Sequence, residues 1–327
     1  MVNRWSCWVS ISTSAAVCVG LASIDALAQS FPARPVHLLV GFTAGGAADV
    51  VTRLVAQKLT ESLPQPVIVE NRAGAGGALA TERVARSPAD GYTLLMMTAA
   101  DTALPALRAK LPYDMERDLV PVSMVAISPF LLVVHPSVPA RSVKELIALA
   151  RVQPGKLSYA SSGIGTVSHL GAELFNAMAG AKIVHVTYKG GAESVIGTAS
   201  GETDMNVPNI ATTRPFLDSG KLRALAVTSS KRASLLPALP TIHESGLPGY
   251  DFVGWWGVLA PAGTPKDVVA RLTTSVGNAV GAPEMRESLV KLGFEAQSNT
   301  PEQFAAYIRR EIAQNAKLIK LAGIKAE

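Results

Sequence analysis

Cysteine is almost missing from this 327-residue chain, and its two examples, Cys7 and Cys18, both lie near the N-terminus. A basic start, a short apolar stretch and the triplet Ala26-Leu27-Ala28 are typical of an export signal. We therefore predict that residues 1–28 are a signal peptide cleaved after Ala28. The alternatives are an uncleaved anchor and, with a poorer match, a lipoprotein processed at Cys18. Cleavage leaves no cysteine, which excludes disulfides, a thiolate nucleophile and a cysteine metal site.

Aromatic and charged residues are also scarce, at 6% and 17% of the chain, and the formal net charge is only +5. No basic run is interleaved with aromatics, so nucleic acid is not an expected partner. A mild positive charge suits a small organic anion. After the signal segment, no apolar stretch is long enough to cross a bilayer. The length and a hydrophobic content of 48% favour a globular protein of about two domains.

Patterns typical of catalysis are missing as well. There is no G-x-S-x-G motif, no obvious carboxylate pair, and no pair of histidines at metal-ligand spacing. The five histidines are dispersed: His37, His135, His169, His185 and His243. We predict a binding protein without cofactor or metal. The alternative is an exported hydrolase or isomerase that pairs a nucleophile such as Ser161 with His169.

What the sequence does contain is a regular alternation of strand and helix patterns. Strands are predicted at 36–42, 66–71 and 91–98, with helices at 47–63 and 76–87 between them, which predicts a parallel sheet covered by helices. A second set of strands and helices follows from residue 142 to residue 229. Two extended apolar segments, near 121–136 and 250–262, connect the two sets. The predicted fold is therefore α/β with two lobes. Lobe 1 is expected to comprise residues 29–128 and 250–327, and lobe 2 residues 129–249.

The stretch VGFTAGGAADVV joins a predicted strand to a predicted helix through a glycine turn. Glycine lets a ligand approach the backbone closely, and free amides at a helix start can hold an anion. The candidate ligand-binding residues here are Phe42, Thr43, Ala44, Gly45, Gly46, Ala48 and Asp49. A plain strand-to-helix connection is the alternative. Asp49 alternatively interacts with the helix dipole and the turn amides.

A second turn, SSGIGT, has the same organisation with more hydroxyl groups. Its candidate ligand-binding residues are Ser161, Ser162, Gly163, Gly165, Thr166 and the nearby His169. The alternatives are a helix N-cap and a packed histidine. Lys189 and Gly190 offer a charge and an amide after another strand, unless Lys189 is only a solvated lysine. Thr98, at the end of a predicted strand, and Pro208 complete the candidate set. The glycines of NRAGAGG, residues 71–77, are interpreted as a tight structural turn rather than a nucleotide loop.

Several of these stretches follow one another in a specific order: VGFTAGGAADVVTRL, VIVENRAGAGG, ADGYTLL, YASSGIGTVSHLGAELF, VHVTYKGG and WGVLAPAGTP. Together they resemble the substrate-binding proteins of tripartite tricarboxylate transporters, the Bug-type family, over nearly all of the mature chain. The resemblance implies a monomeric periplasmic receptor of the two-lobed Venus-flytrap kind. Such receptors bind organic acids and deliver them to membrane carrier subunits. It also implies that Phe42 through Asp49 hold a carboxylate through main-chain amides and ordered water, with Ser161–Thr166 and the segment after YKGG opposite.

Two departures from the family pattern bear on the ligand. Thr43-Ala44 and Ala47-Ala48 stand where the family commonly has prolines and an extra glycine. Val207 and Pro208 stand where it often has an aromatic residue and an Asp. The missing carboxylate suggests a ligand less polar at one end than an amino acid, and aromatic or other monocarboxylates are candidates. A sensor for a signalling partner is a further alternative that the sequence does not separate from transport.

Overall fold

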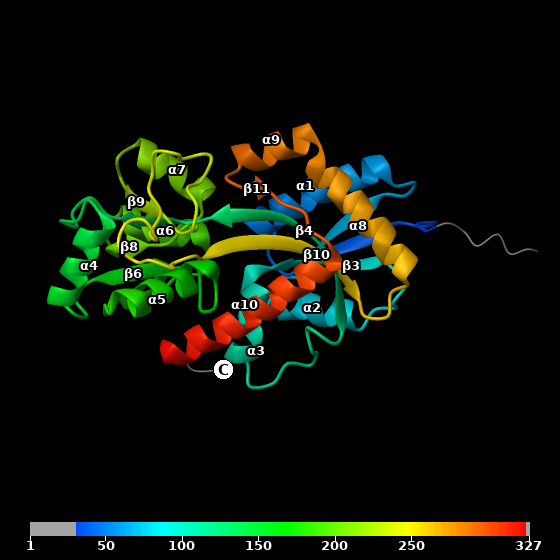
Figure 1. Cartoon of the computed structure of the whole chain (residues 1–327), viewed down its shortest axis with the longest axis horizontal. Helices are drawn as coiled ribbons and strands as arrows, with labels where there is room; N and C mark the ends of the chain where they lie inside the picture. The colour runs from blue at the N-terminus through cyan, green and yellow to red at the C-terminus, as the bar shows by residue number, and fades with distance from the viewer. Residues whose placement is uncertain (1–30, 325–327) are drawn as a thin grey trace, which may run out of the picture. The chain divides into compact units, whose positions relative to one another are not determined.

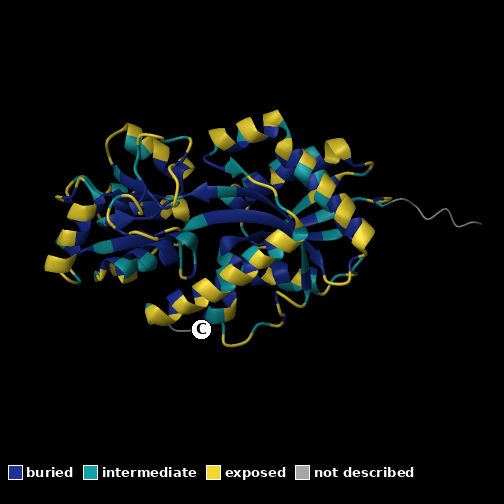
Figure 2. Ribbon diagram, viewed as in Figure 1, coloured by how far each residue is buried: buried dark blue, intermediate teal, exposed yellow. Residues whose placement is uncertain are grey.

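The computed structural model describes residues 31–324, so the predicted signal peptide and its cleavage site lie outside the described residues. From Pro32 onward the chain forms one compact unit by its contacts. Two β-sheets, each flanked by helices, make up this unit (Figure 1). The strands are largely buried, whereas the outward faces of the helices are exposed (Figure 2).

The first sheet has six strands in the order β11-β4-β10-β3-β1-β2. β1 pairs in parallel with β2 and β3, as the sequence predicts, whereas β10 is antiparallel to β3 and β4. The strands are β1 (Val36–Val40), β2 (Val67–Asn71), β3 (Thr93–Thr98), β4 (Leu119–Pro129), β10 (Val253–Pro261) and β11 (Glu295–Ala296). The sheet is therefore mixed, and its parallel part has its carboxyl ends beside Gly41 and Thr98.

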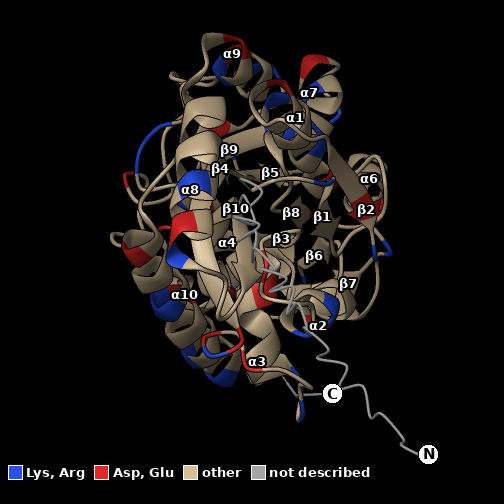
Figure 3. Ribbon diagram, turned by 90° about the vertical axis from the view of Figure 1, so that its right-hand side faces the viewer, with Lys and Arg blue, Asp and Glu red and all other residues tan. Residues whose placement is uncertain are grey.

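Helices cover both faces of this sheet. α1 (Ala47–Ser62) lies against α8 (Lys266–Gly281) and α9 (Pro283–Lys291). The other group is α2 (Ala78–Ala85), α3 (Leu104–Leu107) and α10 (Pro301–Leu321), with the short 3-10 helices η1 (Ala75–Gly77) and η2 (Ala99–Ala103). Lys and Arg are scattered among Asp and Glu over the helices (Figure 3), in keeping with the mild net charge.

The closing helix α10 illustrates how the sequence fixes an element. Thr300 and Gln303 form a reciprocal capping box, and Pro301 occupies the first turn, where its missing N–H costs nothing. Phe304, which is fully buried, then meets Trp255 of β10 edge-to-face at a ring-centroid distance of 5.4 Å. The helix is thereby anchored to the centre of the first sheet.

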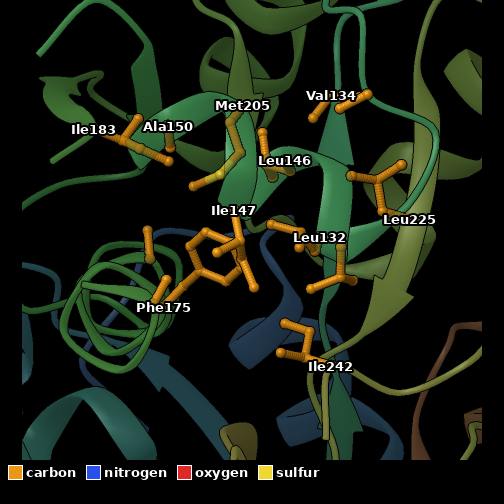
Figure 4. Close-up of a cluster of buried hydrophobic side chains, with 14 of the residues drawn as sticks. Leu132, Val134, Leu146, Ile147, Ala150, Phe175, Ile183, Met205, Leu225 and Ile242 are labelled. Atoms are coloured by element: carbon orange, nitrogen blue, oxygen red, sulfur yellow. The ribbon is translucent and has the colours of Figure 1, made fainter. Parts of the chain in front are cut away.

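The second sheet has five strands in the order β7-β6-β8-β5-β9. β6 is parallel to β7 and β8, whereas β5 is antiparallel to its neighbours β8 and β9. The strands are β5 (Leu131–Val134), β6 (Ser158–Ser161), β7 (Val184–Thr187), β8 (Met205–Asn206) and β9 (Arg223–Val227). The helices are α4 (Val143–Val152), α5 (Val167–Ala179), α6 (Gly191–Ala199) and α7 (Ile210–Asp218). Figure 4 shows the core between this sheet and its helices, where Phe175 of α5 lies among Ile147, Leu132 and Ile242.

The structure changes two details of the predicted elements. The apolar run from Leu119 to Val138 is not one strand, because β4 ends before Phe130 and β5 begins after it. The amide of Phe130 donates a hydrogen bond to the Thr228 hydroxyl at 2.8 Å, so it is not used in the pairing of the first sheet. Helix α7 was not predicted, because Pro215 interrupts its helical pattern, although Asn209 caps its start.

The elements around the two sheets meet in one apolar cluster. It joins Leu107 of α3 and Leu318 and Ile319 of α10 to Leu170 of α5. The lobe boundaries predicted from the sequence remain a prediction. Within residues 31–324, no helix is both long and apolar enough to cross a membrane.

Candidate functional site

The turn between β1 and α1 is the most open part of the candidate site. Thr43, Ala44, Gly45 and Gly46 are all exposed. Gly45 has a φ of +81°, which a residue with a Cβ rarely adopts. Helix α1 begins at Ala47, and no side chain caps it. Its first amides therefore have no partner within the helix.

Asp49 holds this turn from behind. Its side chain is buried, and its carboxylate accepts hydrogen bonds from the Gly45 amide at 2.9 Å, from Arg53 Nε at 3.0 Å and from Asn71 Nδ2 at 2.8 Å. Asn71 also donates to the carbonyl of Phe42 at 3.1 Å. Burial by itself raises the pKa of the Asp49 carboxyl, but the bonds from Arg53, Gly45 and Asn71 outweigh it and lower the pKa. Asp49 thus accepts a hydrogen bond from the turn amide of Gly45. Such an interaction with the turn was the alternative to ligand contact.

The glycine loop after β2 presses against the same edge of the first sheet. A Cβ on Gly41 would lie 2.5 Å from the Cα of Gly77, so the two backbones touch. Gly77 has a φ of +103°, and a Cβ there would overlap the carboxylate of Asp101. These contacts support the interpretation of NRAGAGG as a structural turn.

Asp101 lies in η2 directly below this loop and is almost fully buried. Its Oδ2 accepts hydrogen bonds from both the amide and the hydroxyl of Thr98, each at 2.8 Å. The hydroxyl of Thr98 is therefore already used within the fold. Burial raises the pKa of Asp101 to about 6, although the bonds from Thr98 lower it.

The raised pKa of Asp101 predicts a measurable pH dependence of stability. A carboxyl whose pKa rises on folding contributes stability that is complete below its unfolded pKa and is lost as the pH rises through its folded pKa. We expect the free energy of unfolding to fall by at most about 3 kcal/mol from pH 4 to pH 7 because of this group. Asp101→Asn keeps an acceptor for Thr98 and does not titrate. Denaturant unfolding across pH should therefore show this slope in the native protein and not in the variant; equal slopes would contradict the prediction.

The second turn, between β6 and α5, is held by its own side chains. The Gly163 amide donates to Ser161 Oγ at 3.1 Å, and the Ser162 amide donates to Ser168 Oγ at 3.0 Å. The Gly165 amide donates to His169 Nδ1 at 3.1 Å. Thr166 caps α5 and donates its hydroxyl to the carbonyl of Gly163 at 2.7 Å. Most donors of this turn are thus used within the fold.

The start of α6 lies on the same sheet and offers more unused donors. The helix follows Gly190, which has an extended backbone, and no side chain caps it. Lys189 is exposed, and its amide donates to Glu193 at 3.2 Å. Pro208 is buried, and its carbonyl accepts the Leu131 amide at 2.9 Å. In the described part of the chain, no three metal-binding side chains converge.

Residues 51–324 match the family described as tripartite tricarboxylate transporter family receptor. This chain belongs to that family. A protein of Pseudomonas sp. (strain P51), the UPF0065 protein in the tcbD-tcbE intergenic region, is 39% identical over 292 residues, which is 89% of this chain and 87% of that protein. Protein BugT of Bordetella pertussis is 37% identical over 300 residues, covering 91% of this chain and 92% of BugT. The Bug-type family predicted from the sequence is therefore confirmed.

Solved structures of similar proteins have the same fold as this receptor. An R. palustris protein determined with adipate is 38% identical, with a TM-score of 0.82, over 91% of this chain and 100% of that chain. The periplasmic binding protein BugD is 34% identical, with a TM-score of 0.79, over 91% of this chain and 100% of BugD. The predicted two-lobed binding-protein fold is confirmed, and the family is one of solute-binding receptors rather than enzymes.

In this receptor the candidate site residues form separate groups. Phe42 to Asp49 form one group at the first sheet. Ser161 to His169 and the start of α6 belong to the second sheet. Ser161 does not pair with His169, the example given for the alternative enzyme, because Ser161 Oγ has His185 Nε2 as its partner at 2.6 Å. Ser161 itself is fully buried.

Four residues that shape the site of this receptor were not predicted from the sequence: Arg53, Asn71, Asp101 and His185. Arg53 follows Asp49 by four residues on α1, a spacing that places the two side chains together. That spacing was a usable signal. Asn71 and Asp101 reach their partners from other segments, so no local pattern revealed them. His185 reaches Ser161 only because β6 pairs with β7, so no local pattern revealed its role either.

Proposed function

We propose that this chain is a periplasmic receptor that captures a small organic acid and delivers it to the membrane subunits of a tripartite transporter. The observation that carries the proposal is the exposed turn Thr43–Gly46, with the uncapped start of α1 behind it. Backbone amides stabilise a carboxylate without a fixed cation. Such a site binds an acid and still permits its release.

A second group of donors supports capture between the two lobes. The start of α6 after Gly190 has no side-chain cap, as at α1. An acid held at α1 that also reaches α6 favours the closed arrangement of the lobes, because a ligand shifts an equilibrium by its difference in affinity for the two states. The connection at Phe130 is the place where we expect a hinge. A diacid reaches both helix starts in this arrangement, whereas a monocarboxylate occupies only the start of α1.

Two relatives and one pair of residues support the proposed ligand class. The R. palustris relative was determined with adipate, and MatC of Rhodopseudomonas palustris, which is 31% identical with a TM-score of 0.77 over 88% of this chain and 100% of MatC, has bound malate. Val207 and Pro208 are buried and uncharged. We therefore propose an acid without an amine, with adipate-like diacids and aromatic carboxylates as the first candidates.

The direct test is a thermal-shift and calorimetric screen of the mature protein against adipate, malate, benzoate, citrate, aspartate and glutamate. A ligand that binds only the folded state raises the melting temperature by mass action. We expect a shift with adipate or benzoate and recovery of the unchanged acid. Tight binding of aspartate or glutamate, with no binding of the others, would show that the proposed class is wrong. Consumption of the acid would favour the enzyme.

A single amide can be deleted to test the role of the first turn. Ala47 is the first residue of α1, where proline is tolerated, and Gly46 before it has an extended backbone that proline accepts. We expect Ala47→Pro to weaken acid binding by roughly tenfold while the protein stays folded. Lys266→Pro at the first position of α8 is the matched control and should leave binding unchanged. Unchanged calorimetric affinity of Ala47→Pro would exclude this amide as a ligand donor.

A further inference from the structure

Three rings form a cluster behind the second turn. His169 of α5 lies 4.3 Å from His185 of β7, and His185 lies 4.9 Å from Tyr159 of β6, measured between ring centroids. Tyr159 is fully buried and His169 is 3% exposed. The Tyr159 hydroxyl donates to the carboxylate of Glu173. The proposed function assigns no role to the imidazoles of His169 and His185.

The hydrogen bonds of the second turn define the protonation state of His169. The Gly165 amide is a donor only, so His169 Nδ1 must present a lone pair, and the ring must be neutral with its proton on Nε2. His185 is not fixed in this way. Its Nε2 lies 2.6 Å from Ser161 Oγ, and the Ser161 hydroxyl can either donate to it or accept from it while donating to the Gly163 carbonyl at 3.4 Å.

The same turn is a point of contact between the elements of the two sheets. Gly165 has a φ of +80°, and a Cβ on it would overlap Leu107 of α3. Leu170, the residue after His169, packs in one cluster with Leu107, Leu318 and Ile319. The bond from Gly165 to His169 therefore fixes the backbone that meets α3.

We propose that neutral His169 is a positioning residue that holds the Gly163–Gly165 turn against Leu107, and that protonation of its imidazole loosens this contact and lowers ligand affinity. The inference rests on the proposed receptor function. It adds an acid-sensitive step to ligand release.

The two histidines differ in how they tolerate a proton. A proton on His169 Nδ1 would face the N–H of Gly165, so the hydrogen bond is lost and two donors oppose each other. A proton on His185 Nε2 is less harmful, because Ser161 Oγ can accept it and turn its own hydrogen toward the Gly163 carbonyl at 3.4 Å. His169 is therefore the sensitive member.

The surroundings support a neutral His169. Burial, followed by the neighbouring His185, lowers the pKa of His169 to about 4. The titratable groups on the adjoining strands and on α5 itself are His185, Tyr159 and Glu173. On the other side, the apolar residues of α3 and α10 are flanked by these charged residues: Arg108, Lys317 and Lys320. Because the pKa of His169 is lowered while the Gly163–Gly165 turn contacts Leu107, the neutral ring stabilises this contact fully above pH 6.5, the ordinary histidine pKa. This stabilisation is lost as the pH falls toward 4.

The first test needs no ligand. Nitrogen NMR of the mature protein should show His169 protonated at Nε2 and not at Nδ1 at pH 7. The Gly165 amide should move with the titration of His169 as the pH falls. Protonated Nδ1 at pH 7, or a Gly165 amide that does not respond, would overturn the inference.

The second test uses adipate as the probe, because its affinity can be compared between variants at each pH. His169→Asn places an uncharged acceptor near the position of Nδ1 and does not titrate. We expect the native affinity to fall by about three- to tenfold relative to His169→Asn between pH 7.5 and pH 3.5, because His169 takes up its proton only near pH 4. Using this ratio cancels the titration of adipate itself. A ratio that does not change with pH would refute the proposal.

The matched control is His243, which is exposed and accepts the Gly249 amide at its Nδ1 at 2.8 Å. His243→Asn makes the same chemical change away from the second turn and should leave the pH dependence of adipate affinity unchanged. If adipate fails to bind at any pH, the proposed ligand class fails. The NMR titration of the Gly165 amide still decides the inference in that case.

Discussion

Replacement of Gly41 by alanine is expected to lower the free energy of unfolding by about 3 kcal/mol or more. The new Cβ would lie 2.5 Å from the Cα of Gly77 and 3.1 Å from its carbonyl oxygen. Both of these are backbone atoms, so no side chain can rotate away and the whole 71–77 loop must move. The loop in turn rests on Asp101. Denaturant unfolding followed by circular dichroism measures the effect directly.

Gly277 provides the control for this prediction. It lies in α8, and a Cβ on it meets no atom within 4 Å. Gly277→Ala should therefore raise the free energy of unfolding by about 0.5–1 kcal/mol, the usual gain from replacing a helical glycine. If Gly41→Ala were as harmless as Gly277→Ala, the close approach of the two backbones would not exist in solution.

The strand and helix on either side of Gly41 were predictable from the sequence, whereas the contact that Gly41 makes was not. The strand from Val36 and the helix with Val51, Val55 and Leu59 on its buried face were predictable, because their periodicities are local. The parallel pairing of the first strands followed from their alternation with helices. The contact of Gly41 with Gly77 was not predictable, because two glycines far apart in sequence carry no sign that they meet.

In the candidate site, likewise, the sequence predicted the location of the first turn but not the roles of individual residues. The exposed turn after β1 was located from its glycines and from the resemblance of the whole chain. The roles within each turn were not, because they depend on which side chains use the donors. Ser161 looked like a ligand donor until the structure placed His185 2.6 Å from its hydroxyl. Thr166 caps its helix, which is the alternative that the sequence had left open.

Asp49 is the residue whose loss should affect stability and binding together. Asp49→Ala removes the acceptor for the Gly45 amide, Arg53 and Asn71. The Gly45 amide and the Asn71 side chain then lose a charged partner. We expect the free energy of unfolding to fall by about 2–4 kcal/mol, and the affinity for an organic acid to fall by roughly tenfold or more because the turn is no longer held.

Two variants separate these effects from a general response to a lost charge at a helix start. Asp267 is exposed in the first turn of α8, so Asp267→Ala should cost only about 0.3–1 kcal/mol from the helix dipole and leave binding unchanged. Asp49→Asn retains an oxygen for the Gly45 amide and should keep more affinity than Asp49→Ala. Calorimetry with the acid identified in the screen, together with denaturant unfolding, measures both quantities. If Asp49→Ala lost stability but bound the acid as tightly as the native protein, Asp49 would support only the fold, and the Thr43–Gly46 turn would not be the place where the carboxylate is held.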